Sequence, residues 1–220
     1  PPPRLPSMGS LAFLLLLAAS VTAFAALAWR KLGIVAALAP DARADDPLAR
    51  LDTVVRNGFL QRRMIRLDRA PGLMHTAIFV GFLVLLVRKI QLGVMAWHEP
   101  FVYPGLAGGA FAALKDGVEI VLLVALAYAF WRRFVLKPRR LEPNREAILI
   151  LSLIVVIVVS DFLFDGVRFV IFASDPGIAH ERAFAPVGAA VAALFTGASP
   201  GSLAVGLQVS YWVQMLTVFS

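Results

Sequence analysis

Five runs of mainly apolar residues constrain the fold of this chain more than any other feature of the sequence. A hydrocarbon layer about 30 Å thick needs about 20 apolar residues in helical form. Because the layer offers no water to unpaired backbone groups, such segments cross it as helices. We therefore predict an all-α integral membrane bundle of five transmembrane helices, at about 8–29, 71–92, 115–134, 146–172 and 203–220.

The composition agrees with a membrane protein and excludes several kinds of site. Hydrophobic residues make up 60% of the chain and the mean hydropathy is +0.80, values outside the usual range of soluble domains. The chain has no cysteine, which excludes cysteine-ligated iron–sulfur and zinc sites within these 220 residues. No basic motif interleaved with aromatic residues is present, so we expect no nucleic-acid partner.

The basic residues predict the orientation of the bundle. Segments 30–69 and 132–145 carry nine and six lysines or arginines. The opposite, outer side carries six in total, namely Arg4, Arg88, Lys89, Lys115, Arg168 and Arg182. Cytoplasmic loops of membrane proteins have an excess of such residues. We therefore expect the N-terminus outside the cytoplasm and the C-terminus inside it.

The two ends of the chain carry separate expectations. Residues 1–7 are rich in proline and are expected to form a disordered lead, with the membrane domain covering 8–220. The fifth run is still apolar at Ser220, so we expect the domain to be cut inside or at the end of its last span. Segment 183–196 is apolar but too short to span, and an interfacial or re-entrant helix is expected there.

His75 is the one histidine inside a predicted span. An ionisable side chain at that depth is costly and usually faces the interior of a bundle, where it pairs or binds a cofactor. Neutral imidazole is also a good axial ligand for haem iron. We therefore predict His75 as an axial haem ligand. The alternative is a structural histidine, hydrogen-bonded to Thr76 or to a backbone carbonyl.

A second axial ligand would have to lie at the same depth on a facing helix. His75 is about 7 Å from the cytoplasmic start of its helix. His98 and His180 follow the second and fourth spans on the other side of the membrane. The fifth span reaches the depth of His75 near or beyond Ser220, so the partner ligand is expected beyond that residue.

A group of polar residues occupies the outer half of the predicted bundle. Asp161, Asp165 and Arg168 share one face of the fourth span, so an internal ion pair is expected. Lys115, Asp116 and Glu119 open the third span on the same side, and His98 and Glu99 lie in the loop before it. Within this group, we take His98, Glu119, Asp161, Asp165 and Arg168 as candidates for a quinone pocket with a proton route, because quinone reduction consumes protons. The alternative is charges that reach the interface and stabilise helix ends.

Three blocks of the sequence resemble a known family. Arg66–Phe82, Trp131–Leu141 and Ser160–Gly166 are similar to the second helix, the third-helix exit and the fourth helix of membrane-bound iron–sulfur oxidoreductases related to heterodisulfide reductase. The N-terminal membrane domain of that family resembles the gamma chain of respiratory nitrate reductase. The resemblance covers the chain from about Arg50, and extends to electron-transfer-flavoprotein:quinone reductases and the membrane iron–sulfur protein of dimethylglycine catabolism.

The resemblance implies electron transfer at a bacterial inner membrane. Electrons would pass from an electron-transfer flavoprotein or flavin dehydrogenase, through a cytoplasmic iron–sulfur domain and haem b, to membrane quinone. The clusters would lie outside this segment, and the membrane domain alone is not expected to be a complete enzyme. Two departures bear on haem: Leu85 stands at the family's second histidine position on helix two, and Gln214 replaces histidine in the fifth-helix Trp-x-His pattern. At most one haem is therefore expected.

The sequence leads to three hypotheses about function. The leading hypothesis is a membrane electron-transfer domain that binds haem b and passes electrons to quinone. The alternative is a haem-free membrane anchor for a cytoplasmic redox domain, which Leu85 and Gln214 favour. The third is a small transporter, which predicts internal symmetry and broken helices that the sequence does not show.

Overall fold

The computed structural model describes residues 9–38, 46–138 and 144–219, and the expected lead at 1–7 lies outside these ranges. The all-α prediction is confirmed, because the described residues form helices and contain no strand. In chain order the elements are α1 Ser10–Ala36, α2 Pro47–Val54, η1 Val55–Phe59, α3 Arg62–Leu67, α4 Arg69–Met95, α5 Gly105–Trp131, η2 Arg132–Leu136, α6 Arg145–Ile171, α7 Pro176–Phe184, α8 Pro186–Ala193 and α9 Pro200–Phe219. The elements η1 and η2 are short π-helical turns.

Four of the described helices, α1, α4, α6 and α9, are long and apolar enough to cross a membrane. They correspond to the first, second, fourth and fifth predicted spans. The third predicted span also folds as a helix, but α5 begins at Gly105 rather than near Lys115 and is not among the four. Lys115, Asp116 and Glu119 reduce the apolar character of α5, and all three are buried.

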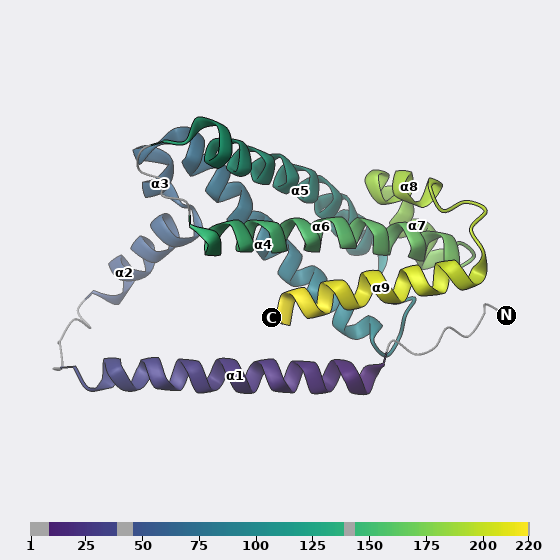
Figure 1. The fold of residues 1–220 in the computed structure, drawn as a ribbon, viewed down its shortest axis with the longest axis horizontal. Coiled ribbons are helices and arrows are strands. Elements are labelled where there is room, and N and C mark those ends of the chain that lie inside the picture. The colour runs from purple at the N-terminus through teal and green to yellow at the C-terminus, as the bar shows by residue number, and fades with distance from the viewer. Residues whose placement is uncertain (1–8, 39–45, 139–143, 220) are drawn as a thin grey trace.

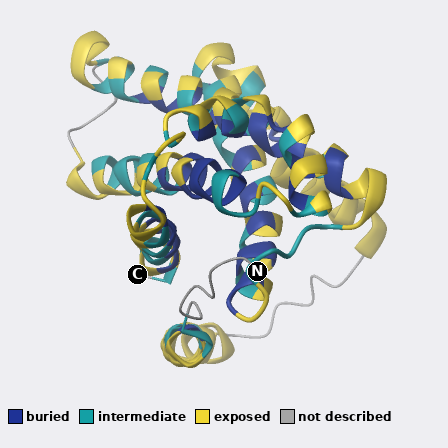
Figure 2. Ribbon diagram, turned by 90° about the vertical axis from the view of Figure 1, so that its right-hand side faces the viewer, coloured by how far each residue is buried: buried dark blue, intermediate teal, exposed yellow. Residues whose placement is uncertain are grey.

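Helix α9 lies alongside α6, and α4 packs on α5 and crosses α6 and α9 obliquely, while α1 runs along one edge of the molecule (Figure 1). Close to the N-terminal end of α1, Phe13 packs edge-on against Trp97 and Phe219. Most other side chains of α1 are exposed (Figure 2). A helix that is apolar on every face and exposed in this way suits a lipid environment.

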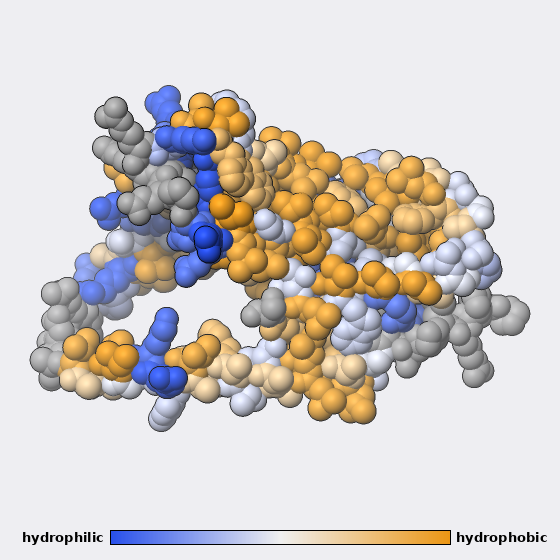
Figure 3. Space-filling model, in the orientation of Figure 1, coloured by the Kyte–Doolittle hydropathy of each residue, from blue (hydrophilic) through white to orange (hydrophobic). Residues whose placement is uncertain are grey.

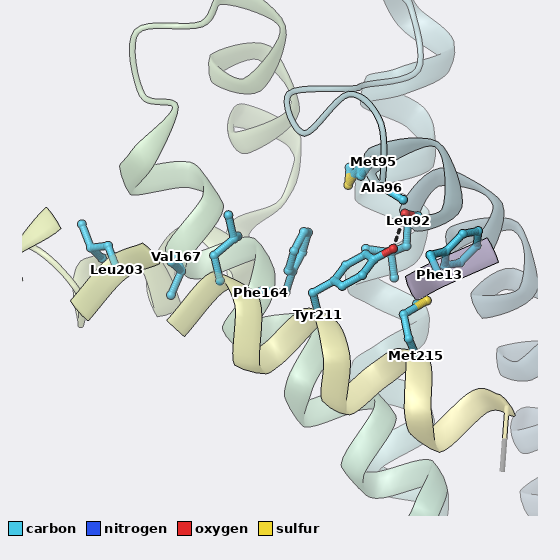
Figure 4. Packing of buried hydrophobic residues seen from close by; sticks show 10 residues of the cluster. Phe13, Leu92, Met95, Ala96, Phe164, Val167, Leu203, Tyr211 and Met215 are labelled. Carbon is cyan, nitrogen blue, oxygen red and sulfur yellow. Dashed lines mark hydrogen bonds between the residues drawn. The ribbon is translucent and has the colours of Figure 1, made fainter. Parts of the chain in front are cut away.

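Two of the buried apolar clusters join the long helices of the bundle. In the first, Tyr211 of α9 lies against Phe164 of α6, and its hydroxyl donates to the Leu92 carbonyl oxygen of α4 at 3.4 Å (Figure 4). The second joins α4, α5 and α6 through buried apolar side chains, namely Leu85, Leu122, Leu126, Val158 and Phe162. Because the same three helices carry buried charges, this packing determines where those charges meet.

The short helices α7 and α8 cover one end of the bundle (Figure 1). The Asp175 carboxylate caps α7 by accepting hydrogen bonds from the N–H groups of Gly177 and Ile178 at 2.9 and 3.0 Å. Helix α8 crosses α6 closely, because a Cβ on Gly166 would lie 2.6 Å from Val191. With eight residues α8 is too short to span a bilayer.

The other end of the molecule carries the basic segments α2, η1 and α3. Hydrophilic side chains gather over this end in the space-filling view (Figure 3). Helix α3 packs on the start of α4, where a Cβ on Gly72 would lie 2.6 Å from the Ile65 Cα. Arg132 of η2 approaches Asp68 at 3.9 Å. The first turn of α4 and the end of α5 therefore meet at the basic end.

Candidate functional site

A group of polar side chains lies inside the bundle between α4, α5, α6 and α7. Each of its residues is at most 4% exposed, and together we call them the buried charge cluster. Its members are Arg88, Gln91, Lys115, Asp116, Glu119, Asp161, Asp165, Arg168 and Glu181. Charges at such positions are tolerated when they pair with one another, and this cluster does so across four helices.

Arg88 of α4 joins two carboxylates of α6. Its Nε atom lies 3.1 Å from Asp161 Oδ1 and 3.2 Å from Asp161 Oδ2, and its Nη2 atom donates to Asp165 Oδ1. Its Nη1 atom donates to Gln91 Oε1 at 2.6 Å, one turn further along α4. The guanidinium therefore has an acceptor at each of its three nitrogens, as a buried arginine requires.

Lys115 of α5 reaches the same two carboxylates from the other side. Its Nζ atom lies 2.8 Å from Asp165 Oδ2, 3.3 Å from Asp161 Oδ2 and 3.1 Å from Glu119 Oε2. Asp161 and Asp165 are thus each shared between a lysine and an arginine from different helices. Glu119 has one cationic partner, and its Oε1 atom makes no hydrogen bond in the described structure.

Arg168 extends the cluster towards α7 and the loop after α4. Its Nη1 atom donates to Glu181 Oε2 at 2.8 Å, and its Nη2 atom donates to the Phe101 carbonyl oxygen at 2.8 Å. Asp165 lies further from Arg168 Nη1, at 3.9 Å. Gln91 Nε2 donates to Glu181 Oε1 at 3.4 Å, which closes the connection back to α4.

Asp116 links the cluster to α8. Its Oδ2 atom accepts hydrogen bonds from the backbone N–H groups of Val187 at 2.7 Å and Gly188 at 3.3 Å. These groups belong to the first turn of α8 and have no partner within the helix. A carboxylate there also interacts favourably with the positive end of the helix dipole. Asp116 therefore caps α8 from a neighbouring helix.

The cluster contains more acids than bases. Five carboxylates face three cations within it, and Lys89, next to Arg88 on α4, supplies a fourth cation within electrostatic reach of Asp161. The Lys89 Nζ atom donates to Gln214 Oε1 of α9 at 2.5 Å. With every group ionised, the count leaves one negative charge, which a single bound proton would neutralise.

The structure brings together four of the five polar candidates from the sequence. Glu119, Asp161, Asp165 and Arg168 all belong to the cluster, whereas His98 is exposed and its side chain makes no hydrogen bond or ion pair with the described members of the cluster. The ion pair expected on one face of α6 exists at 3.9 Å, but the shorter bonds come from other helices. The alternative of charges reaching the interface is wrong for these four residues, because they point into the bundle.

Sequence reasoning missed three members of the cluster, Arg88, Gln91 and Glu181. Arg88 was counted with the basic residues of the outer side, although it lies inside α4 and is fully buried. The two adjacent charges Arg88 and Lys89 within the predicted span 71–92 were the signal that could have identified it.

His75 lies in a second place, a pocket between α4, α5 and α6 at the basic end. The pocket has a volume of about 430 Å³ and is lined by His75, Arg132 and Arg133 together with apolar residues. We call it the His75 pocket. Its main apolar lining residues are Met74, Ile78, Ala129, Ile150, Leu151 and Ile154.

The imidazole of His75 is exposed and makes no hydrogen bond in the described structure. The Thr76 hydroxyl donates instead to the Gly72 carbonyl oxygen at 2.8 Å. The structural role considered for His75, a hydrogen bond to Thr76 or to a carbonyl, is therefore not what the described residues show. The ring is available to a ligand in the pocket.

The described part of α9 does not reach the level of His75. Two hydrogen bonds join α9 to α4, Lys89 to Gln214 and Tyr211 to Leu92, and they show that the two helices run in opposite directions. His75 precedes Lys89 by 14 residues (89 minus 75), or about 21 Å along the helix. His98 and His180 are exposed and lie in or near the loops at the other end.

The two positions that depart from the family pattern have structural roles. Leu85 is buried among Leu122, Leu126 and Phe162, which fill the space beside it. Gln214 is fully buried and bonded to Lys89. Both positions are therefore occupied by interactions between helices.

Two curated proteins match most of this chain in sequence. The probable iron-sulfur-binding oxidoreductase FadF of Bacillus subtilis (strain 168) is 26% identical over 184 residues, which are 78% of this chain and 24% of that protein. The EtfAB:quinone oxidoreductase of Syntrophomonas wolfei subsp. wolfei is 27% identical over 200 residues, 87% of this chain and 28% of that protein. This chain is related to iron–sulfur oxidoreductases.

The relation confirms the broader part of the predicted resemblance. It supports a redox electron-transfer role, and the four apolar helices support a role as a membrane anchor. The chain spans about a quarter of the length of these two relatives. No family model matches the chain, and no solved structure matches it.

Proposed function

We propose that this chain is a membrane electron-transfer domain that links a cytoplasmic flavoprotein or iron–sulfur donor to membrane quinone through one haem b. The observation that carries the proposal is the His75 pocket. It offers an uncommitted imidazole beside two arginines and apolar walls, in a chain related to an EtfAB:quinone oxidoreductase. The electron-transfer flavoprotein and the iron–sulfur domain are partners proposed from these relatives.

The proposed topology follows the family resemblance to the nitrate reductase gamma chain. Helix α5 crosses the membrane together with α1, α4, α6 and α9, which gives five spans in all. Its charged side chains do not prevent this, since they face the bundle interior rather than lipid. The basic segments α2 to α3 and η2 lie on the cytoplasmic side of a bacterial inner membrane. Four of the six basic residues counted on the outer side, Arg88, Lys89, Lys115 and Arg168, lie within the long helices α4, α5 and α6. The difference between the two sides of the membrane in basic residues outside the spans is therefore larger than the sequence count indicated.

The residues of the His75 pocket suit a haem held by one protein ligand at this end. Imidazole is a common axial ligand, and the apolar side chains suit the faces of a porphyrin. When bound, haem would supply one-electron transfer. Leu85 and Gln214 leave no corresponding site near the buried charge cluster, which supports a single haem. We propose that the second axial ligand comes from beyond Ser220.

The buried charge cluster is the proposed source of protons for quinone reduction. Glu119 is the proton-carrying group, because it has one cationic partner and an Oε1 atom without a hydrogen bond, while Asp161 pairs with two cations and Asp165 with three. Arg168, Asp161 and Asp165 stay ionised and form the ion pairs that surround Glu119. His98, which lies outside the cluster, is proposed as a proton group at the surface where protons are exchanged with water.

A reduced-minus-oxidised spectrum of membranes containing the full-length protein tests the haem. We expect a b-type alpha band in the parent protein that is lost in His75→Ala. His180→Ala is the matched control, since His180 is an exposed histidine whose ring contacts Phe184 at a tilt of 56°. If the band is absent from the parent, or survives in His75→Ala, the haem part of the proposal is wrong.

Infrared difference spectroscopy tests the proton group. A protonated carboxyl buried away from water absorbs separately from a carboxylate, and we expect Glu119→Gln to remove that band. Glu146→Gln, an exposed glutamate in the first turn of α6, is the control and should keep it. A protonated-carboxyl band unchanged by Glu119→Gln would assign the proton to another residue.

A haem-free membrane anchor for a cytoplasmic redox domain is the second candidate function. Two observations favour it: the absence of a second histidine at the level of His75 in the described structure, and the use of Leu85 and Gln214 in packing. This candidate expects quinone reduction by the full-length protein at an undiminished rate in a preparation that contains no haem.

A further inference from the structure

Arg133 carries a positive charge that has no ionic partner among the described residues. Its Nε and Nη1 atoms are buried and make no hydrogen bond, and no ion pair to its guanidinium is found among the described residues. Buried polar groups in native proteins almost always have a partner, and one without a partner calls for a bound ion, water or ligand. The neighbouring Arg132 at least approaches a carboxylate, Asp68, at 3.9 Å.

The surroundings of Arg133 indicate what kind of partner is missing. Arg133 lines the His75 pocket, and no acidic side chain lines it. Arg132 lies at the same end of the pocket, while Ile150, Leu151 and Ile154 of α6 form an apolar wall. A pocket with two guanidinium groups and an apolar wall matches a molecule with an anionic group on an apolar body.

We propose that Arg133, supported by Arg132, binds the anionic group of an amphiphile that occupies the His75 pocket. Guanidinium binds carboxylates and phosphates through paired hydrogen bonds, which would satisfy Nε and Nη1 together. Two molecules offer this chemistry: a haem, through its propionates, and an anionic membrane lipid, through its phosphate. The haem source rests on the proposed function, whereas the lipid source does not.

The first arm of the test measures haem in the full-length protein. Arg133→Gln removes the charge and retains much of the side-chain volume. If a haem carboxylate binds Arg133, the haem midpoint potential should be lower in Arg133→Gln than in the parent, because the lost positive charge had favoured the reduced state. The potential should fall less in Arg133→Lys, since lysine keeps the charge without the paired donors. Lys137→Gln, which removes an exposed charge at the same end, should leave the potential unchanged.

The second arm measures lipid. The purified protein is titrated with phosphatidylglycerol or phosphatidylcholine, and bound lipid is counted by native mass spectrometry. If Arg133 binds the phosphate of an anionic lipid, phosphatidylglycerol should be retained more than phosphatidylcholine by the parent and by Lys137→Gln, because choline neutralises the phosphate charge of the second lipid. Arg133→Gln should lose that preference, and Arg133→Lys should retain part of it.

The two arms separate the possible failures. A haem that is insensitive to His75→Ala would overturn the proposed axial ligand while the lipid arm still supports a role for Arg133. The inference about Arg133 is overturned if Arg133→Gln behaves like Lys137→Gln in both arms, with the same haem potential and the same lipid preference. Circular dichroism of each variant confirms that the helices are intact.

Discussion

Arg88 and Asp161 form a salt bridge of 3.1 Å in which both side chains are completely buried. The two residues lie 73 positions apart, on α4 and α6. Removing two charges from water is costly, and the attraction between them offsets that cost only with good geometry and further hydrogen bonds. Gln91, Asp165 and Lys115 provide these further bonds.

Arg88→Met is expected to destabilise the bundle strongly. The change leaves Asp161 and Asp165 with Lys115 as their main remaining cation, and breaking a buried ion pair by removing one partner costs about 3–5 kcal/mol. Thermal stability in detergent, followed as the fraction of protein that stays monodisperse, measures the effect. Lys31→Met, at an exposed position on α1, is the control and should change little. Equal stability of the two variants would contradict a stabilising role for the Arg88 network.

Asp161→Leu combined with Arg88→Met is expected to be less harmful than the sum of the two single changes. Replacing both partners of a buried pair with apolar groups removes the unpaired charge that each single change leaves behind. The difference between the double variant and the sum of the single variants gives the coupling, which should be about 1–3 kcal/mol. Because Lys115 also loses a partner, we expect partial rather than full recovery. Additive single effects would mean that the two groups do not interact.

Asp116→Ala should loosen α8 locally. Without the carboxylate, the N–H groups of Val187 and Gly188 lose their acceptor, and loss of a helix cap costs about 0.5–2 kcal/mol. Hydrogen exchange at these two amides should therefore become faster. Asp175→Ala is the matched control, because it removes the cap of α7 instead and should accelerate exchange at Gly177 and Ile178. Unchanged exchange in α8 would show that Asp116 is not its cap.

The sequence could predict the helices and one face of the charge cluster, because both depend on local spacing. Runs of about 20 apolar residues identified the long helices, and offsets of three and four placed Asp161, Asp165 and Arg168 together on α6. The start of α5 was missed because the glycine- and alanine-rich stretch after Gly105 has the composition of a connection.

The partners of that face could not be predicted from spacing. Arg88 and Glu181 meet α6 only because α4 and α7 pack on it, and nothing in the local sequence gives the rotation of one helix against another. The capping of α8 by Asp116 depends on a contact across 71 positions and was invisible for the same reason. His75 was recognised because a histidine in an apolar run is unusual by itself.

Gly166→Ala is expected to destabilise the crossing of α6 and α8. A Cβ at this position would lie 2.6 Å from Val191 Cγ1 and 3.1 Å from its carbonyl carbon, so α8 would have to move. Gly117→Ala is the matched control, since it is also a helical glycine but has nothing within 4 Å of its Cβ position. The control should be neutral or more stable, by up to about 1 kcal/mol, because alanine favours helix. If the two variants had the same thermal stability in detergent, the close crossing of α6 and α8 would be disproved.

Labelling of introduced cysteines should report opposite sides of the membrane for the two ends of the bundle. The chain has no cysteine of its own, so Asn57→Cys and Ala173→Cys each give one reactive site in these 220 residues, and both positions are exposed. Because Asn57 lies in the arginine-rich segment, it should be cytoplasmic, and Ala173, after α6, should be outside. A membrane-impermeant maleimide should therefore label Ala173→Cys in intact spheroplasts and Asn57→Cys only in inverted vesicles. The reverse pattern would invert the proposed orientation and place the His75 pocket at the outer face.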